Sequence, residues 1–238
     1  MPAPLRLLIA ADTFPPNVNG AATFTVNLAS GMAARGHEVH VVAPAASRRH
    51  GTWTEEYDGQ PITVHRLPSD RWHPHDWLRY VKPWRARHHM RRVLDEVQPD
   101  VIHYQSAVVL GRAAVREGAG RGIRIIGTNH LMLENMGEHT LMPAFLQTIA
   151  AKIWWHDAHK TFAATEALTT PTRRAANFLE ENGDLDGVLA ISCGLRTSNY
   201  TPRFEQKSPR SILFVGRVTG EKQIDVLMRA FKQLDDLS

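Results

Sequence analysis

Residues 5–44, LRLLIAADTFPPNVNGAATFTVNLASGMAARGHEVHVVAP, decide the fold. The apolar run at 5–11 does not alternate with polar residues, which is typical of a strand buried on both faces. Apolar residues at helical spacing then predict a helix over 23–35, and Gly36 ends it. A second strand follows at 37–44. The stretch is therefore a strand–helix–strand unit of the kind that builds parallel sheets.

The same alternation continues along the chain. Further strands are predicted at 62–68, 99–105, 123–130, 167–172 and 187–194. Helices are predicted at about 78–97, 107–122, 142–165 and 173–183. Such alternation predicts an α/β fold with a Rossmann-like, doubly wound parallel sheet. Ligands bind such sheets outside the carboxyl ends of the strands, so the informative loops follow Ala11, His103, Gly127 and Val215.

The chain divides into unequal parts. Residues 1–200 predict one complete sheet domain, and the polar segment 201–210, which holds two prolines, is the linker. Residues 211–238 include ILFVGRVTGEKQIDVLMRAF (212–231), which predicts a strand, a glycine turn and an amphipathic helix. The amino end of a helix offers unpaired N–H groups and a positive dipole end, so this turn can hold a phosphate. A second α/β unit therefore begins here.

Composition narrows the class of protein. The chain has 238 residues, of which 43% are hydrophobic and 22% charged, as in ordinary globular proteins. Its single cysteine, Cys193, excludes an internal disulfide and favours a reducing, cytoplasmic setting. The apolar run near the amino end is too short for a signal peptide, and no window reaches the roughly 18 apolar residues that span a bilayer. No serine hydrolase elbow and no Walker A motif occur in the sequence.

The loop PPNVNGAATF (15–24) joins the first predicted strand to the first helix. Small residues from Gly20 onward let a ligand approach the backbone N–H groups where the helix starts. The alternative is that Asn19 and Gly20 only form a tight turn that caps the helix. The loop lacks the GxGxxG spacing of a dinucleotide site, which argues against an NAD-dependent enzyme. Asn19 is also a candidate contact for an acceptor.

His130 and Glu134 lie at and just beyond the end of the strand predicted at 123–130, on the side of the sheet that binds ligands. A histidine there can donate to a sugar hydroxyl or a phosphate oxygen, and a near-neutral pKa permits proton transfer. The alternative is a structural histidine, one of 13 in the chain. Glu134 is a second candidate contact for an acceptor. The histidines lack the spacing of a zinc motif and no cysteine pair accompanies them, so no metal is expected.

Residues 70–92 combine four aromatic side chains with seven basic residues, although the whole chain carries a net charge of only +4. This mixture suits an anionic membrane surface. The alternative is a helix whose aromatic residues enter the core while its arginines stay solvated. Nucleic acid is not expected, because no nucleic-acid-binding module is present and the charge is low. The membrane-surface candidates are Trp72, Trp77, Arg79, Lys82, Trp84 and Arg85.

Three stretches, in order, resemble the retaining glycosyltransferases of family 4, which have the GT-B fold. They are the opening PPNVNGAATFTVNLASGMAARGHEVHVVAP, the segment LAISCGLRTSNYTP, and ILFVGRVTGEK. The last of these is similar to the family's donor-phosphate motif, G-R-x-x-x-E-K. The resemblance covers essentially the whole chain. It implies the N-terminal half of a GT-B fold, whose first domain binds the acceptor and whose second binds a nucleotide-diphosphate sugar.

The resemblance also implies site residues. Arg217 and Lys222 match the pair that contacts the donor diphosphate, where fixed cations stabilise the charge on the departing phosphate. Gly20 matches the loop glycine near that diphosphate, and His130 matches the histidine near the transferred sugar. The implied reaction is hexosyl transfer with retention of configuration and without a metal or other cofactor. The sequence does not resolve whether the donor is linked to GDP or UDP.

The chain departs from the family pattern at several positions. The stretch Ser192-Cys193-Gly194-Leu195-Arg196 stands where the family has an asparagine before the glycine and an aspartate after it. Gln223 replaces a common glycine. The family's second acidic motif, E-x7-E, has no counterpart here. We therefore expect a truncated donor domain that is inactive by itself. Its lone strand edge should pair with another copy, so oligomers through 211–238 are expected.

The sequence is compatible with two classes of acceptor. The segment at 70–92 favours a membrane glycolipid, and a soluble glycoside is the alternative within the family. The expected location is cytoplasmic, with peripheral binding to the inner face of the plasma membrane. A different class of function, a non-catalytic α/β module that binds a glycan or nucleotide, is the second hypothesis.

Overall fold

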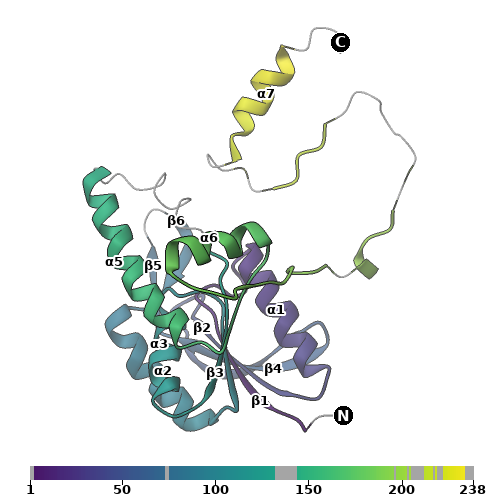
Figure 1. Cartoon of the computed structure of the whole chain (residues 1–238). Helices are drawn as coiled ribbons and strands as arrows, with labels where there is room; N and C mark the ends of the chain where they lie inside the picture. Colours follow the sequence, from purple (N-terminus) through teal and green to yellow (C-terminus); the bar gives the residue numbers. More distant parts are fainter. Residues whose placement is uncertain are drawn as a thin grey trace. The chain divides into compact units, whose positions relative to one another are not determined.

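The computed structural model describes residues 3–72, 75–131, 144–195, 197–202, 204, 212–216, 218 and 222–233. The chain forms two compact units, Met1–Cys193 and Gly194–Ser238. The first unit contains the sheet, and the helices of that unit lie against it (Figure 1).

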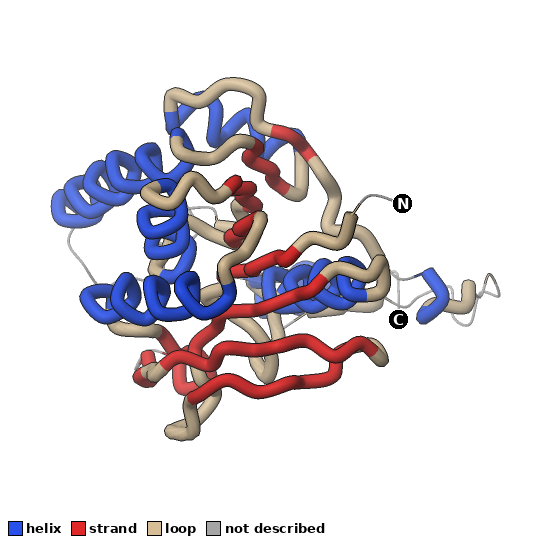
Figure 2. The backbone as a smooth tube through the Cα atoms, turned by 90° about the horizontal axis from the view of Figure 1, so that it is seen from below, coloured by secondary structure: helices blue, strands red, loops and turns tan. Residues whose placement is uncertain are grey.

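The sheet of the first unit has the strand order β10-β9-β8-β7-β1-β2-β4-β3 (Figure 2). The strands are β1 (Arg6–Ala10), β2 (Glu38–Pro44), β3 (Gly51–Tyr57), β4 (Gln60–Leu67), β7 (Val101–Tyr104), β8 (Arg124–Thr128), β9 (Ala167–Thr170) and β10 (Leu189–Ala190). All neighbours pair in parallel except β3, which runs antiparallel to β4. The predicted α/β fold with a doubly wound parallel sheet is therefore confirmed.

Helices cover both faces of this sheet. They are α1 (Gly20–Ala33), α2 (Pro83–Val97), α3 (Leu110–Ala119), α5 (Ala144–Ala163) and α6 (Arg173–Gly183). Alternate residues of β1 enter different cores: Leu7 and Ile9 pack with α1, whereas Leu8 and Ala10 pack with the other four helices. Figure 1 shows α1 on the opposite side of the strands from α2 and α3. This division follows from right-handed crossovers that wind outward from β1 in both directions.

Two hairpins differ from the sequence-based expectation. Strand β3 was not expected, and β5 (Asp70–Trp72) pairs antiparallel with β6 (His75–Tyr80), where a helix was predicted to start near residue 78. Helix α2 instead starts at Pro83. Proline lacks an N–H and excludes the helical conformation for the residue before it, so it fits the first turn of a helix and not its interior. The helix prediction is wrong for residues 78–82.

The second unit also departs from expectation. Helix α7 (Ile224–Lys232) forms where a helix was predicted. Residues 212–215, predicted as a strand, form none. A strand needs a hydrogen-bonded neighbour, and the described residues from 194 onward contain no strand that could supply one. The expectation of an oligomer through 211–238 rested on an unpaired strand edge, and residues 212–215 form no strand. The oligomer itself stays a prediction.

A chain of side-chain hydrogen bonds crosses the outer strands. Glu38 Oε1 lies 2.9 Å from His40 Nε2, and His40 Nδ1 lies 3.1 Å from His65 Nε2. His65 Nδ1 lies 3.0 Å from the Thr52 hydroxyl. Because a carboxylate only accepts, His40 donates from Nε2 and accepts at Nδ1 from His65. Burial, helped by the charges of His40 and Arg92, lowers the pKa of His65 to about 4.

We predict that acid destabilises the fold through His65, which is 2% exposed. The unfolded chain protonates this ring below its ordinary pKa of 6.5, whereas the folded chain keeps it neutral down to about pH 4. The free energy of unfolding should therefore fall between pH 7 and pH 5, by about 2 kcal/mol for this ring. Urea titrations should show a smaller fall in H65Q. An equal fall in H65Q and wild type would contradict the assignment. The control H156Q, at an exposed position of α5, should behave as wild type.

Candidate functional site

The winding of the sheet reverses at β1. The connection after β1 passes through α1 to β2, whereas the connection after its other neighbour, β7, passes through α3 to β8. The loops after β1 and β7 therefore diverge toward opposite faces. In doubly wound sheets, ligands bind outside the carboxyl ends of the strands at such a point. The predicted residues Asn19 and His130 lie in loops at this end of the sheet, and Gly20 is the first residue of α1 there.

Asp12 joins the two diverging loops. Its Oδ1 accepts from Leu110 N at 2.9 Å, and both carboxylate oxygens lie 3.3 Å from Val109 N. The Ser106 hydroxyl donates to Oδ2 at 3.4 Å. These donors form the amino end of α3, where unpaired N–H groups and the helix dipole favour a negative charge. Burial nevertheless dominates and raises the pKa of Asp12 to about 6.

His130 lies beside Gln105 and Phe24. Its Nε2 is 3.1 Å from Gln105 Oε1, and its ring centroid is 4.9 Å from that of Phe24 in α1. Burial lowers the pKa of His130 to about 4, so the ring is neutral at pH 7. The near-neutral pKa expected from the sequence is therefore wrong.

Two buried polar atoms next to His130 have no hydrogen-bond partner among the described residues. They are Gln105 Nε2 and Asn129 Oδ1, in side chains of residues that are 2% and 3% exposed. Gln105 directly follows β7, and Asn129 directly follows the neighbouring strand β8. Burying an amide group without a partner is unfavourable, so such atoms are normally satisfied by water or a ligand. Both residues lie where the sequence predicted ligand-binding loops, after His103 and Gly127, but their residue types alone did not single them out.

The loop before α1 caps the helix through Asn19 and leaves open space next to Gly20. Asn19 Oδ1 accepts from Ala22 N at 2.9 Å and from the Thr13 hydroxyl at 3.4 Å, so this side chain caps the helix. A Cβ added to Gly20 would meet no heavy atom within 4 Å. The amino end of α1 thus offers backbone N–H groups beside open space. A contact from Asn19 to an acceptor stays a prediction.

The other predicted site residues are placed less fully. Glu134 and Arg217 lie outside the described residues. Lys222 is exposed, two residues before α7 in the second unit. Among the residues that can be described, no group of three metal-ligating side chains occurs.

The basic and aromatic segment is partly exposed. Trp72 and Trp84 are 47% and 74% exposed. Lys82 pairs with Asp70 at 3.3 Å, and Arg79 Nε donates to Ser69 at 2.9 Å. The interpretation that the aromatic residues enter the core is therefore wrong for these two tryptophans. The side chain of Trp77 lies outside the described part.

Two arginines of this segment form ion pairs with another helix of the fold. Arg87 and Arg91 both bind Glu117, a buried residue of α3, at 2.8 and 3.0 Å. Arg85 and Arg92 are exposed on the same helix, α2. None of the helices in the described part is long and apolar enough to cross a membrane.

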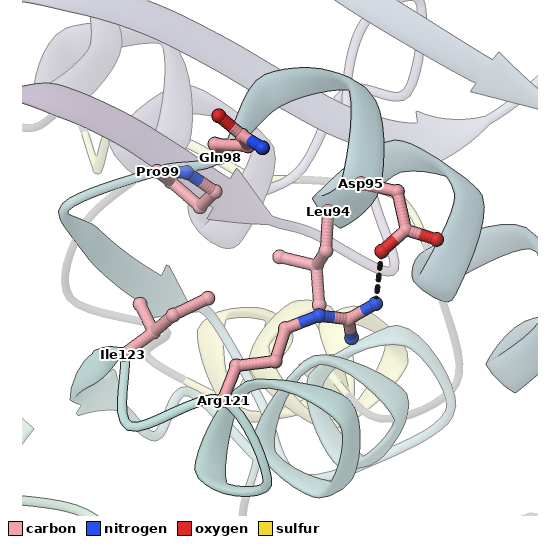
Figure 3. Close-up of a pocket in the computed structure, with 6 residues that line it drawn as sticks. All are labelled: Leu94, Asp95, Gln98, Pro99, Arg121 and Ile123. Carbon is pink, nitrogen blue, oxygen red and sulfur yellow. Dashed lines mark hydrogen bonds and ion pairs between the residues drawn. The ribbon is translucent and has the colours of Figure 1, made fainter.

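Two surface hollows lie at the other end of the sheet. One, of about 250 Å³, is lined by Leu94, Asp95, Gln98, Pro99, Arg121 and Ile123. Figure 3 shows the Arg121–Asp95 ion pair along its wall. The second, of about 280 Å³, is lined by Trp155, His156, His159, Asn182, Gly183 and Asp184. Their lining residues precede β7, β8, β9 and β10, so both hollows lie toward the amino ends of the strands, away from the candidate site.

The comparisons with known proteins agree with this layout. Residues 18–199 match the family described as Glycosyltransferase Family 4. A GDP-mannose-dependent alpha-mannosyltransferase of Mycobacterium tuberculosis is 25% identical over 94% of this chain and 58% of its own length. The alpha-monoglucosyldiacylglycerol synthase of Acholeplasma laidlawii is 22% identical over 95% of this chain and 59% of its own length. The chain thus spans less than two thirds of the curated relatives it matches.

A solved structure shows the same fold. The sucrose-phosphate synthase of Thermosynechococcus elongatus superposes with a TM-score of 0.67 at 14% identity, covering 97% of this chain and 60% of that one. At this identity the likeness concerns the fold alone.

Gly20, the first residue of α1, and Gly111, the second residue of α3, provide a matched test of the site's framework. A Cβ on Gly111 would lie 1.9 Å from the Ser106 carbonyl oxygen, whereas one on Gly20 meets open space. We predict that G111A lowers the free energy of unfolding by roughly 2 kcal/mol or more and that G20A does not lower it. Thermal or urea unfolding of both variants checks this, and equal stability would refute the packing described at the start of α3.

Proposed function

Because the chain belongs to glycosyltransferase family 4, we propose that it forms the acceptor-side part of an enzyme that transfers a hexose from a nucleotide-diphosphate sugar. The observation that carries the proposal is the polar group of Gln105, Asn129 and His130 at the carboxyl edge of β7 and β8. Hydroxyl-rich ligands suit such a group, because each sugar hydroxyl both donates and accepts.

The proposed donor is GDP-mannose, since the first relative described above is named for its dependence on it. Lys222 and Arg217 would hold the donor diphosphate. Fixed cations stabilise the charge that develops on a departing phosphate, and they do so without a metal. The amino end of α1 at Gly20 would supply N–H groups to the same diphosphate.

The proposed reaction retains the configuration of the sugar, with the acceptor attacking on the face that the diphosphate leaves. His130 is neutral at pH 7 because burial lowers its pKa to about 4. Its part would be to orient a hydroxyl of the transferred sugar, and the departing phosphate would take up the acceptor's proton. The 238 residues alone are expected to show no transfer.

We predict that the whole protein transfers labelled mannose from GDP-mannose and that K222Q lowers the rate by about a hundredfold or more. The control K232Q removes an equal charge from the other end of α7 and should keep wild-type activity. Full activity in K222Q would exclude the proposed role of Lys222. Binding of sugar nucleotides without turnover of any hexose would instead favour the non-catalytic module.

The acceptor is proposed to be a glycolipid reached from the inner face of the plasma membrane. The exposed Trp72 and Trp84 lie close in sequence to Arg85 and Arg92, a combination that favours the headgroup region of an anionic bilayer. One relative is named a synthase of a glucosylated diacylglycerol. A soluble glycoside is the alternative acceptor.

We predict that the 238-residue chain co-sediments with anionic vesicles at low salt and is released at high salt, since screening weakens such attraction. R85Q/R92Q should weaken binding about tenfold or more. The control R173Q/R174Q makes the same charge change on α6 and should bind as wild type. Absence of salt-sensitive binding by the wild type would remove the basis for a membrane acceptor.

A further inference from the structure

Gln105 is held rigidly at the point where the winding reverses. The residue is 2% exposed, and its backbone N–H donates to Ala10 O of β1 at 2.9 Å. Its side-chain Oε1 lies 3.1 Å from His130 Nε2, while Nε2 of the same amide is buried without a partner among the described residues. The side chain therefore contacts His130 with one end and presents an unused polar atom with the other.

A chain of hydrogen bonds beside His130 involves other residues and does not include its ring. His103 Nε2 lies 2.8 Å from the Thr128 hydroxyl, which lies 2.8 Å from the Thr169 hydroxyl. Thr169 donates to the Gly127 carbonyl at 3.2 Å. Because a carbonyl only accepts, Thr128 donates to Thr169, and His103 donates from Nε2 to Thr128. The donors of this chain are thus used internally, whereas Gln105 makes a hydrogen bond to the His130 ring.

We propose that Gln105 is a positioning residue that holds His130 in the tautomer with the proton on Nε2. A neutral imidazole carries one N–H, so donation from Nε2 to Gln105 leaves Nδ1 as an acceptor. The Phe24 ring against the imidazole limits its rotation. Gln105 thereby decides what kind of ligand atom His130 can receive.

This arrangement selects hydroxyls over phosphates. A sugar hydroxyl can donate to Nδ1 of His130, and a second oxygen of the sugar can accept from Nε2 of Gln105. The diphosphate of a sugar nucleotide carries no proton on its oxygens at neutral pH, so these oxygens cannot donate to Nδ1 and are repelled by its lone pair. The identity of the ligand as a sugar rests on the proposed function. The tautomer and its dependence on Gln105 do not.

The test is NMR of the 238-residue chain with ¹⁵N-labelled histidine, because nitrogen shifts separate a protonated ring nitrogen from one with a lone pair. H130Q assigns the His130 signals. In wild type we expect the proton on Nε2, and in Q105L a mixture of tautomers or a shift to Nδ1. In Q105E we expect Nε2–H to persist and the pKa of His130 to rise by one unit or more, since a negative charge next to the ring favours its cation. Among the residues that the structure describes, His103 is a titratable ring that interacts electrostatically with His130.

Two results would overturn the positioning role of Gln105. A proton on Nδ1 in wild type overturns the proposal, as does an unchanged pKa in Q105E. If Q105L fails to fold, the pKa in Q105E decides alone. The control T128V removes the partner of His103 and should change the His103 signals while leaving those of His130. If the NMR result holds but the whole protein transfers no hexose, the proposed function fails and the positioning role stands.

Discussion

The hydrogen bonds from the amino end of α3 to the Asp12 carboxylate hold the candidate site together. They bridge the loops after β1 and β7, which diverge because right-handed crossovers wind outward from β1 in both directions. The start of α3 is fixed by this contact, and Gln105 lies just before it on the same loop. The position of Gln105 in turn sets the orientation of His130. A buried carboxylate with a raised pKa is thus part of the framework of the candidate site.

The two faces of the sheet differ in the size of their apolar cores and in their polar side chains. Helix α1 packs on β2 and β4 and closes a small apolar core. On the same face, β7 to β9 carry the hydrogen-bonded chain of His103, Thr128 and Thr169. The larger core lies on the opposite face under α2, α3, α5 and α6. The polar side chains of β7 to β9 thus lie next to the loops that hold the buried amide atoms of Gln105 and Asn129. Most of the apolar packing lies on the opposite face.

Much of this architecture could be predicted from the sequence. Buried parallel strands leave continuous apolar runs, so the order of strands and helices followed from residues 5–44 and their successors. The start of α2 could also have been found, because Pro83 carries the signal. Strand β3 was harder, since one side of it is exposed and its alternation of Thr, Trp and Glu is weak. Asp12 and Gln105 lie in loops that the sequence named as informative, but their individual roles arise from contacts between segments far apart in the chain.

We propose that ligands bind at the carboxyl edge between β1 and β7 and not at the hollows of the opposite edge. Hydrogen–deuterium exchange of the whole protein with and without GDP-mannose tests it most directly. The account predicts slower exchange in peptides covering 11–20, 105–110 and 127–131, with no change at 94–99 and 121–123. Protection confined to the latter two segments, in a protein shown by calorimetry to bind the sugar nucleotide, would contradict it.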